Sequence, residues 1–285
     1  MNHINKLLSL SLFCFAGLSI AQCPPANFSQ QDSEKLVEQK FQINDGALRN
    51  NLALEFLACI DNPDPYWRDT IAFTSLSIWL RSNLLKIETV KALRSKLLVD
   101  LQNTDDPEGF RRPFAALLLS EVARVDRIKE TFSAEEFNAL ITPTANYMTS
   151  IIDYRGFDEK TGWRHAVAHS SDLILQLSIN PRINAEQQAQ LLDALAKQIA
   201  PSSNVFFQYG EPERLQRAVY FAYQTQKLDD TYWTKWFESM SNPAPLENWK
   251  TKKKTQVGLA KRHNTLSFLF ALCATAYSKK KEKTA

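Results

Sequence analysis

Similar eight-residue stretches recur along this 285-residue chain and constrain its fold more than any other feature. YWRDTIAF (66–73), GFRRPFAA (109–116) and GWRHAVAH (162–169) share an aromatic residue, an arginine and an alanine at the same spacings, and LQRAVYFA (215–222) is a looser copy. The first three copies start 43 and then 53 residues apart, with one or two amphipathic segments between them. A repeat of this length cannot bury its apolar side alone and must stack on its neighbours.

The sequence predicts an all-α fold. Only seven glycines occur, helical periodicity continues almost throughout, and runs of alternating or β-branched residues are absent. We therefore expect an α/α superhelix, a HEAT- or armadillo-like solenoid of antiparallel helix pairs, with a partly closed α/α toroid as the alternative. Chance similarity among amphipathic helices is the competing explanation of the repeat. The expected helices are 33–42, 46–60, 65–82, 87–101, 110–127, 133–150, 163–179, 184–199, 211–227, 229–240 and 255–277.

Two helix starts carry clear local signals. Asp106-Pro107 offers an N-cap followed by proline at the first helical position, where the missing N–H costs nothing. Ser133 followed by Glu136 has the spacing of a capping box. Both pairs mark places where a helix is expected to begin.

The chain opens with MNHINKLLSLSLFCFAGLSIAQC, in which one lysine precedes an apolar run of roughly a dozen residues and then small residues. This order predicts a cleaved signal peptide at 1–21, one all-helical domain at 22–278 and a basic disordered tail at 279–285, with a periplasmic or secreted location. A membrane span would need about 20 apolar residues, so no transmembrane segment is expected after cleavage. A lipid anchor on Cys23 is the minority alternative, because Gln22 stands where a lipoprotein signal has a small residue.

Three cysteines remain after the expected cleavage, namely Cys23, Cys59 and Cys273. Export permits disulfides, and a Cys23–Cys59 bridge and no bridge at all are equally open. Cys273 lies in the apolar run LSFLFALCATA, which predicts a buried free thiol.

Positive charge is concentrated at the C-terminal end. Residues 250–285 hold ten lysines and arginines against Glu282 alone, although the whole chain carries only +3. On an exported protein such a patch would meet envelope polyanions before nucleic acid, so no nucleic-acid partner is predicted. A solvated loop and a frayed tail are the simpler interpretation.

Two of the four histidines stand four residues apart in TGWRHAVAHSSDL (161–173). On a helical wheel His165, His169, Asp172 and Gln176 fall within about 60° of one another, opposite the apolar residues of the segment. We therefore expect these side chains to face away from the core, toward water or into the concavity of the solenoid. Structural hydrogen bonds, a binding groove, and metal or acid–base chemistry are the three interpretations, in that order.

Equivalent helices of a solenoid lie side by side, so the same register carries a row of basic residues. The position of Pro113 indicates that these helices begin nearby, where unpaired amides and the helix dipole favour an anion. The sequence thus predicts a binding surface for an anionic small ligand, an envelope polyanion or a protein partner. Its candidate residues are Arg68, Arg111, Arg164, His165, His169, Asp172, Arg217 and His263.

No cofactor is predicted, and the catalytic residues remain unknown. Histidines at i and i+4 can hold a metal, so His165 and His169 are weak candidates, with Asp172 or His263 to complete the set. The zinc hydrolase pattern needs Glu beside the first histidine, where Ala166 stands. The sequence contains no Gly-rich phosphate loop, nucleophile elbow or recognisable Cys–His arrangement.

Aromatic residues are frequent in FFQYGEPERLQRAVYFAYQ (206–224), and packing in the core is their simplest interpretation. Phe206, Phe207 and Tyr209 fall in an expected loop between helices. These three are therefore the better candidates for stacking on sugars or peptides.

The segment GWRHAVAHSSDL, an aromatic residue followed by HAxAH and Asp-Leu, resembles the bacterial family catalogued as domain of unknown function 2785. The similarity extends over much of residues 45–275, including RHNTLSFLFAL in the last expected helix. The resemblance implies a helical domain and supplies no activity. We predict an exported binding protein of unknown oligomeric state. The alternative is a hydrolase of a cell-wall saccharide or peptide that uses His169 and Asp172. Whether the chain is an enzyme is therefore open at this point.

Overall fold

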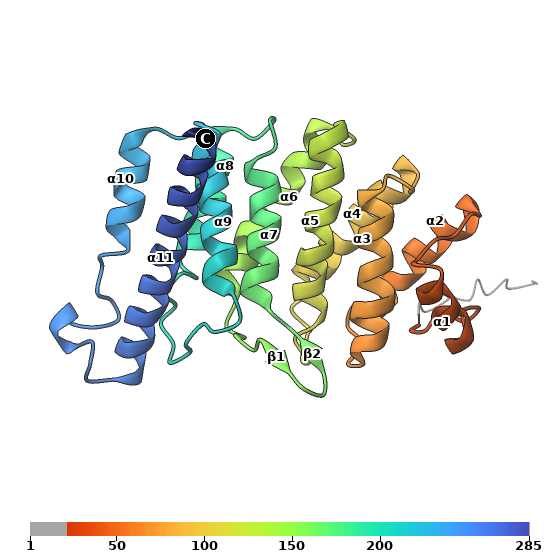
Figure 1. The fold of residues 1–285 in the computed structure, drawn as a ribbon, viewed down its shortest axis with the longest axis horizontal. Helices are drawn as coiled ribbons and strands as arrows, with labels where there is room; N and C mark the ends of the chain where they lie inside the picture. The colour runs from red at the N-terminus through yellow and green to blue at the C-terminus, as the bar shows by residue number, and fades with distance from the viewer. Residues whose placement is uncertain (1–21, 285) are drawn as a thin grey trace, which may run out of the picture.

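The computed structural model describes residues 22–284, so the expected signal segment at 1–21 lies outside it. The fold is all-α apart from one short hairpin, as predicted (Figure 1). The elements in chain order are α1 (Gln30–Glu38), α2 (Gly46–Glu55), η1 (Phe56–Cys59), η2 (Tyr66–Phe73), α3 (Thr74–Arg81), α4 (Ile87–Gln102), α5 (Arg111–Lys129), α6 (Ala134–Ser150), β1 (Phe157–Asp158), β2 (Gly162–Trp163), α7 (Ala166–Ser178), α8 (Ala185–Ala196), α9 (Glu211–Gln224), α10 (Asp230–Ser239), η3 (Trp249–Thr251) and α11 (Gln256–Thr284).

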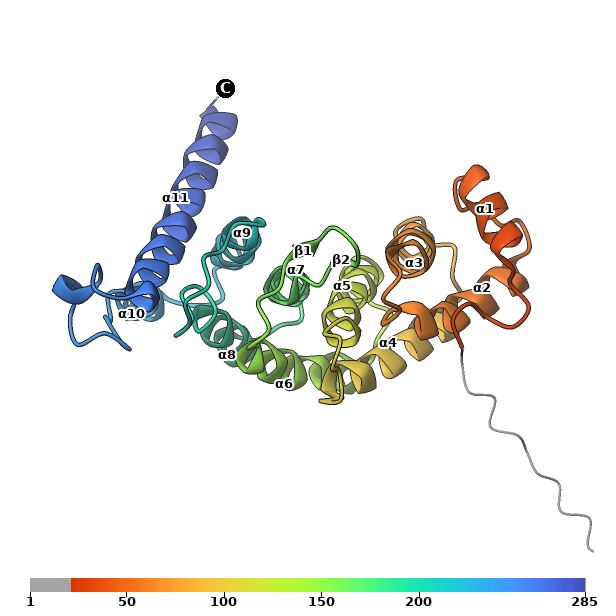
Figure 2. The same cartoon turned by 90° about the horizontal axis from the view of Figure 1, so that it is seen from below.

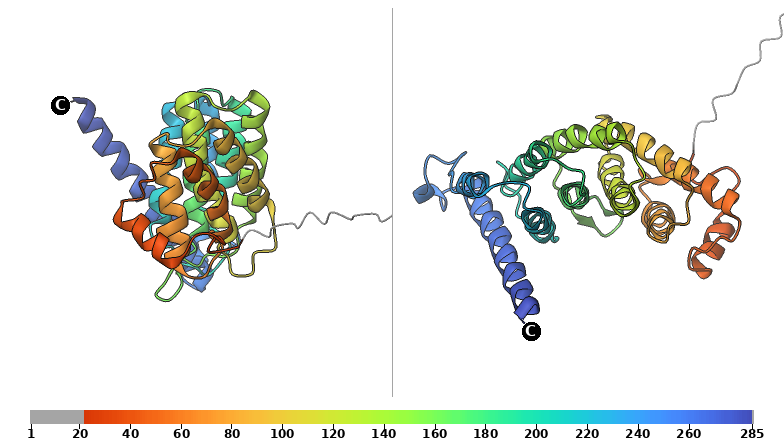
Figure 3. Two further views of the ribbon diagram at one scale, coloured as in Figure 1. Left: turned by 90° about the vertical axis from the view of Figure 1, so that its right-hand side faces the viewer. Right: turned by 90° about the horizontal axis from the view of Figure 1, so that it is seen from above.

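The helices form two curved layers (Figure 2). Helices α3, α5, α7 and α9 lie side by side in the inner layer, and α4, α6 and α8 lie behind them. Figure 3 shows the same arc from the opposite side, with α1 and α11 projecting at its two ends. The arc is open, unlike the toroid considered as the alternative. We call the side of the inner layer that faces between α1 and α11 the concave face.

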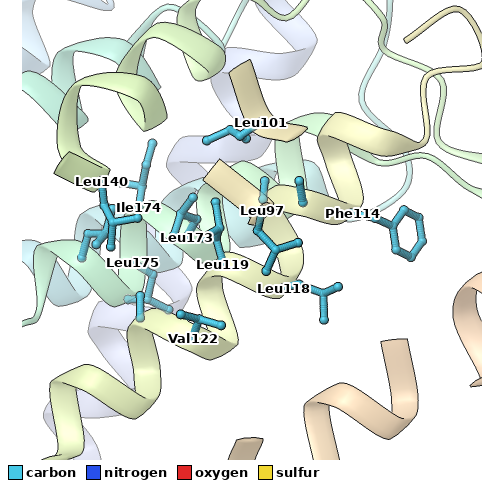
Figure 4. Close-up of a cluster of buried hydrophobic side chains, with 14 of the residues drawn as sticks. Leu97, Leu101, Phe114, Leu118, Leu119, Val122, Leu140, Leu173, Ile174 and Leu175 are labelled. Carbon is cyan, nitrogen blue, oxygen red and sulfur yellow. The ribbon is translucent and has the colours of Figure 1, made fainter. Parts of the chain in front are cut away.

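The core lies between the two layers. Apolar side chains of α4, α5, α6 and α7 meet there, and alanines of the recurring stretches, such as Ala115 and Ala168, are fully buried where α5 packs on α7 (Figure 4). The recurring pattern therefore marks the start of successive inner-layer helices. Buried members of this core include Leu97, Leu101, Leu118, Leu119, Leu140 and Ile174.

Local signals fixed one of the two predicted helix starts. Ser133 and Glu136 form the expected capping box at the start of α6. The prediction for Asp106-Pro107 was wrong about the proline, because α5 begins only at Arg111 and Pro107 lies in the preceding turn. Asp106 nevertheless caps this start, since its carboxylate accepts hydrogen bonds from the backbone N–H groups of residues 109–112.

Two expected helices differ in their first turns. The segment expected as 65–82 begins with a π-helix, η2, at whose end the backbone N–H of Thr74 donates to the carbonyl of Asp69 five residues earlier. Apolar periodicity cannot distinguish this wider turn from an α-helix. The segment expected as 163–179 begins instead with strand β2, and α7 starts at Ala166.

The C-terminal helix is longer than expected. Residues 279–284 continue α11 instead of forming the predicted disordered tail. In Figure 2 the second half of α11 stands away from the other helices. For this reason Cys273 is exposed, and the prediction that it is buried was wrong. Cys23 and Cys59 form a disulfide, the bond that the sequence left open.

Within residues 22–284, none of the helices combines the length and the apolar character needed to cross a membrane.

Candidate functional site

The first turn of α7 is set by the hairpin that precedes it. β1 and β2 pair antiparallel, and the backbone pairing continues as Arg164 N–H donates to the carbonyl of Gly156 and His165 N–H to that of Arg155. His165 is the N-cap of α7, with a left-handed backbone (φ 59°, ψ 39°) that non-glycine residues seldom adopt. This turn places the His165 ring beside the ring of His169, and the two ring centroids lie 5.6 Å apart.

The α7 row, which we define as His165, His169, Asp172 and Gln176, does not face open solvent. His165 is 8% exposed and His169 is 7% exposed, so the expectation that they face away from the core was wrong. The wheel considered α7 alone, whereas α5 and α9 pack against its two sides. The His169 ring meets Phe114 of α5 edge-on at 5.3 Å, and the indole of Trp163 stacks on His165 at 4.9 Å.

Each buried histidine has a ring nitrogen without a hydrogen-bond partner, Nε2 in His165 and Nδ1 in His169. The nearest carboxylate to His165 Nε2 is Oε1 of Glu211, at 3.7 Å. Burial, reinforced by the charge of Arg214, lowers the pKa of His165 to about 4. Burial also lowers the pKa of His169 well below its ordinary value, so both rings are neutral at pH 7.

Farther along α7, the row continues as ion pairs and hydrogen bonds to neighbouring helices. Asp172 pairs with Arg214 of α9, and Gln176 accepts a hydrogen bond from Arg127 of α5. Burial raises the pKa of Asp172 despite the opposing charge of Arg214. The α7 row therefore forms a polar seam between three inner-layer helices.

A second ion pair of the inner layer joins α3 to α5. Arg81 binds Glu121, whose side chain is 6% exposed, while the Arg81 side chain is 57% exposed. This pair was not predicted from the sequence. A carboxylate inside the apolar run LLLSEVA was the signal that could have found it, because a buried charge needs a partner.

Arg68 and Arg164 are internal, although both were predicted to bind ligand. The Arg68 side chain is fully buried, and its guanidinium lies 4.0 Å from the centroid of the Phe110 ring. The Arg164 guanidinium lies 4.2 Å from the same ring centroid. Arg68 donates to the carbonyl of Thr161, and Arg164 donates to that of Glu108, so the two arginines tie the β1–β2 hairpin to η2 and to the start of α5.

The other predicted basic residues lie apart from this pair. Arg111 pairs with Asp61 and Asp100. Arg217 is exposed on α9, one turn beyond Arg214. His263 of α11 contacts the loop before α9, with Nε2 3.2 Å from the carbonyl oxygen of Phe207.

The eight predicted ligand-binding residues therefore do not form one surface. The structure brings together His165, His169 and Asp172, and it brings Arg68 and Arg164 together around Phe110. The shared register of the helices did not predict where the arginines lie, because the long arginine side chain can carry its guanidinium to carbonyls and rings inside the fold.

A metal ion would need more ligands than the histidine pair supplies. Across residues 22–284, His, Cys, Asp and Glu side chains form no group of three or more that could hold one. His263 lies with the Phe206–Phe207 segment, where its ring centroid is 5.4 Å from that of Phe206.

Comparison with known proteins adds a family and no activity. No curated protein and no solved structure matches the chain. The model of a family described as "Protein of unknown function (DUF2785)" matches residues 97–273, which run from α4 into α11 and include the whole α7 row. This match covers more than half of the chain, which therefore belongs to the DUF2785 family.

Proposed function

We propose that this chain is an exported α-solenoid binding protein. Its concave face binds a segment of a partner protein, and that partner segment carries charges of both signs. The observation that carries the proposal is the arrangement of charge on the inner layer. On α5 and α7, the buried carboxylate of Glu121 and the carboxylate of Asp172, whose side chain is 15% exposed, are each paired with a more exposed arginine from a neighbouring helix.

The exposure of these arginines supports exchange with a partner. The side chains of Arg81 and Arg214 are 57% and 41% exposed, and Arg217 adds a further exposed cation. A partner's acidic groups can bind the exposed guanidinium groups. A partner's basic group that takes an arginine's place keeps the carboxylate paired, which matters because an unpaired buried charge is costly.

The same arrangement favours a protein segment over a dense polyanion. A polyanion on the concave face would approach two carboxylates as well as the arginines, and like charges at an interface reduce affinity. A peptide with both acidic and basic side chains can instead match each sign in turn. We therefore place the partner-protein interpretation ahead of the envelope polyanion.

A peptide array tests this proposal. Purified protein lacking residues 1–21 would be applied to mixed-charge 15-residue peptides, and positive peptides would be measured by fluorescence anisotropy. We expect the double variant Arg214→Ala, Arg217→Ala to weaken binding at least tenfold, and binding to weaken with salt. Arg262→Ala, an exposed arginine on α11, is the matched control. Absence of any positive peptide, or equal binding by the double variant, would reject the proposal.

Export is tested separately. Residues 1–25 fused to a reporter enzyme that is active only outside the bacterial cytoplasm should give activity, and Leu7→Arg, Leu10→Arg in the apolar run should abolish it. A fusion that stays inactive would remove export from the proposal and leave the concave face unaffected.

A second candidate function is a hydrolase of a cell-wall saccharide or peptide. The neutral buried histidines favour it, because a neutral ring with an unpartnered nitrogen can accept a proton. Incubation with purified peptidoglycan should then release soluble fragments, and His169→Gln should stop the release. If the unaltered protein releases no fragments, this candidate is excluded.

A further inference from the structure

A cavity of about 510 Å³ lies beside the β1–β2 hairpin and reaches Glu211, one turn before Arg214 on α9. One wall is the hairpin region, residues 154–164, and the other is the segment 205–211 that leads into α9. Figure 1 shows the hairpin at the end of the inner layer where α7 and α9 begin. We call this cavity the hairpin pocket. Its volume is within the range of small-molecule sites, about 300–1,000 Å³.

Exposed aromatic rings gather at the hairpin pocket. Phe157, Trp163, Phe206 and Tyr209 are each 36–46% exposed. Phe157 and Trp163 have ring centroids 5.0 Å apart, and Trp163 meets Tyr209 edge-on at 5.9 Å. Phe157, Phe206 and Tyr209 line the cavity itself, and Trp163 contacts two of them without being part of the lining, while the Phe206 ring contacts His263. Exposed rings grouped in this way mark a contact surface.

The backbone holds these rings in place. Gly156 packs so closely on Tyr209 that a Cβ atom at residue 156 would lie 2.0 Å from the tyrosine ring. Phe207, between the exposed residues, is buried, and its N–H donates to the side chain of Asn264 on α11. Preorganised rings lose little entropy when a ligand binds.

Charged and polar side chains also line the hairpin pocket, namely Arg155, Asp158, Lys160, Thr161, Arg164, Gln208 and Glu211. The least exposed of them is Glu211, at the start of α9. The residue is only 3% exposed, and Oε2 accepts a hydrogen bond from the backbone N–H of Tyr209 at 2.9 Å. Its other oxygen, Oε1, faces the unpartnered Nε2 of His165 at 3.7 Å. A carboxylate in the lining of the cavity supplies acceptors for the hydroxyl groups of a polar ligand.

We infer that the hairpin pocket binds a saccharide, with Phe157 and Phe206 stacking on the sugar rings and Glu211 accepting hydrogen bonds from hydroxyl groups. A sugar ring presents C–H faces and hydroxyl edges, which is the combination that exposed aromatics around a buried carboxylate can match. A purely apolar ligand would leave the polar side chains of this lining without partners.

The test uses chitotetraose and cellotetraose as probes, with the protein lacking residues 1–21. Binding would be detected by saturation-transfer NMR and quantified by calorimetry. We expect at least one of the two sugars to bind and the double variant Phe157→Ala, Phe206→Ala to weaken it at least tenfold. Glu211→Gln should also weaken binding, because its amide has one acceptor oxygen where the carboxylate has two.

The control is Phe237→Ala on α10, a ring that is 37% exposed but does not line the hairpin pocket, and it should bind like the unaltered protein. Circular dichroism would show that each variant is folded, and the single variant Phe206→Ser replaces the double variant if that does not fold. Failure of both sugars to bind, or undiminished binding by the folded aromatic variants, would overturn the inference.

Discussion

Replacing Arg68 with alanine should destabilise the fold instead of weakening a binding surface. In the structure this guanidinium is fully buried and donates to the carbonyl oxygens of Asn62 at 2.8 Å and Thr161 at 2.7 Å. It also forms two hydrogen bonds to the carboxylate of Asp69 and lies on the Phe110 ring. The side chain thus joins η2, the turn before it and the β1–β2 hairpin.

The expected cost follows from these contacts. A buried acceptor left without a donor costs about 1–3 kcal/mol, so two carbonyls give about 2–6 kcal/mol. The Asp69 side chain is 29% exposed and can be hydrated, so it adds little. Loss of the contact with Phe110 adds about 1 kcal/mol. These contributions sum to about 3–7 kcal/mol, and broken buried pairs cost about 3–5 kcal/mol, so we expect Arg68→Ala to lower the free energy of unfolding by about 3–5 kcal/mol.

Urea unfolding followed by circular dichroism measures this loss. With a urea dependence of about 2–3 kcal/mol per molar, the midpoint should fall by about 1–2 M. Arg68→Lys should recover less than half of the loss, because a single ammonium cannot reach both carbonyls and the carboxylate. Arg217→Ala, at an exposed arginine of α9, should change the free energy of unfolding by less than about 0.5 kcal/mol. A loss below about 1 kcal/mol for Arg68→Ala would refute the structural role.

Three further perturbations test other parts of the structure. Reducing the Cys23–Cys59 disulfide, which links residues 36 positions apart, should lower the free energy of unfolding by about 3–4 kcal/mol in urea titrations with and without reductant. Because the folded pKa of His165 is about 4 and the unfolded value is near 6.5, the unfolded chain protonates first as the pH falls. Stability present above pH 6.5 should therefore decline by about 3 kcal/mol toward pH 4. Unfolding from pH 4 to 7 should show a smaller decline for His165→Asn, since asparagine tolerates the left-handed backbone; an unchanged decline would exclude this histidine as its source. Gly156→Ala should lower the melting temperature by several degrees, because its Cβ would lie 2.0 Å from a tyrosine ring, whereas Gly46→Ala, with 3.6 Å to its nearest neighbour, should not.

Distant packing explains why part of the candidate site was mispredicted. The wheel correctly grouped His169, Asp172 and Gln176 on one side of α7, since that depends only on 100° per residue. His165 precedes α7, and its left-handed backbone, which no wheel describes, places its ring beside His169. The wheel could not show that α5 and α9 cover that side. The positions of these two helices against α7 are set by contacts between residues 40 to 60 positions apart in the sequence. The hairpin before α7 was missed for a similar reason. Strands of two residues are too short to show a periodic pattern in the sequence. The turn between β1 and β2 is held by hydrogen bonds from Arg68 and Arg164 to Thr161.

The helical class, the positions of most helices and the recurring stretches were predictable from the sequence alone. These features depend on local propensity and on apolar spacing within one or two turns, which any short window contains. Which polar side chains are free to meet a ligand was set by the packing of the layers. That choice depends on where each side chain reaches after the layers have packed, so Arg68 became a buried support, while Phe206 and Tyr209 remained exposed beside a cavity.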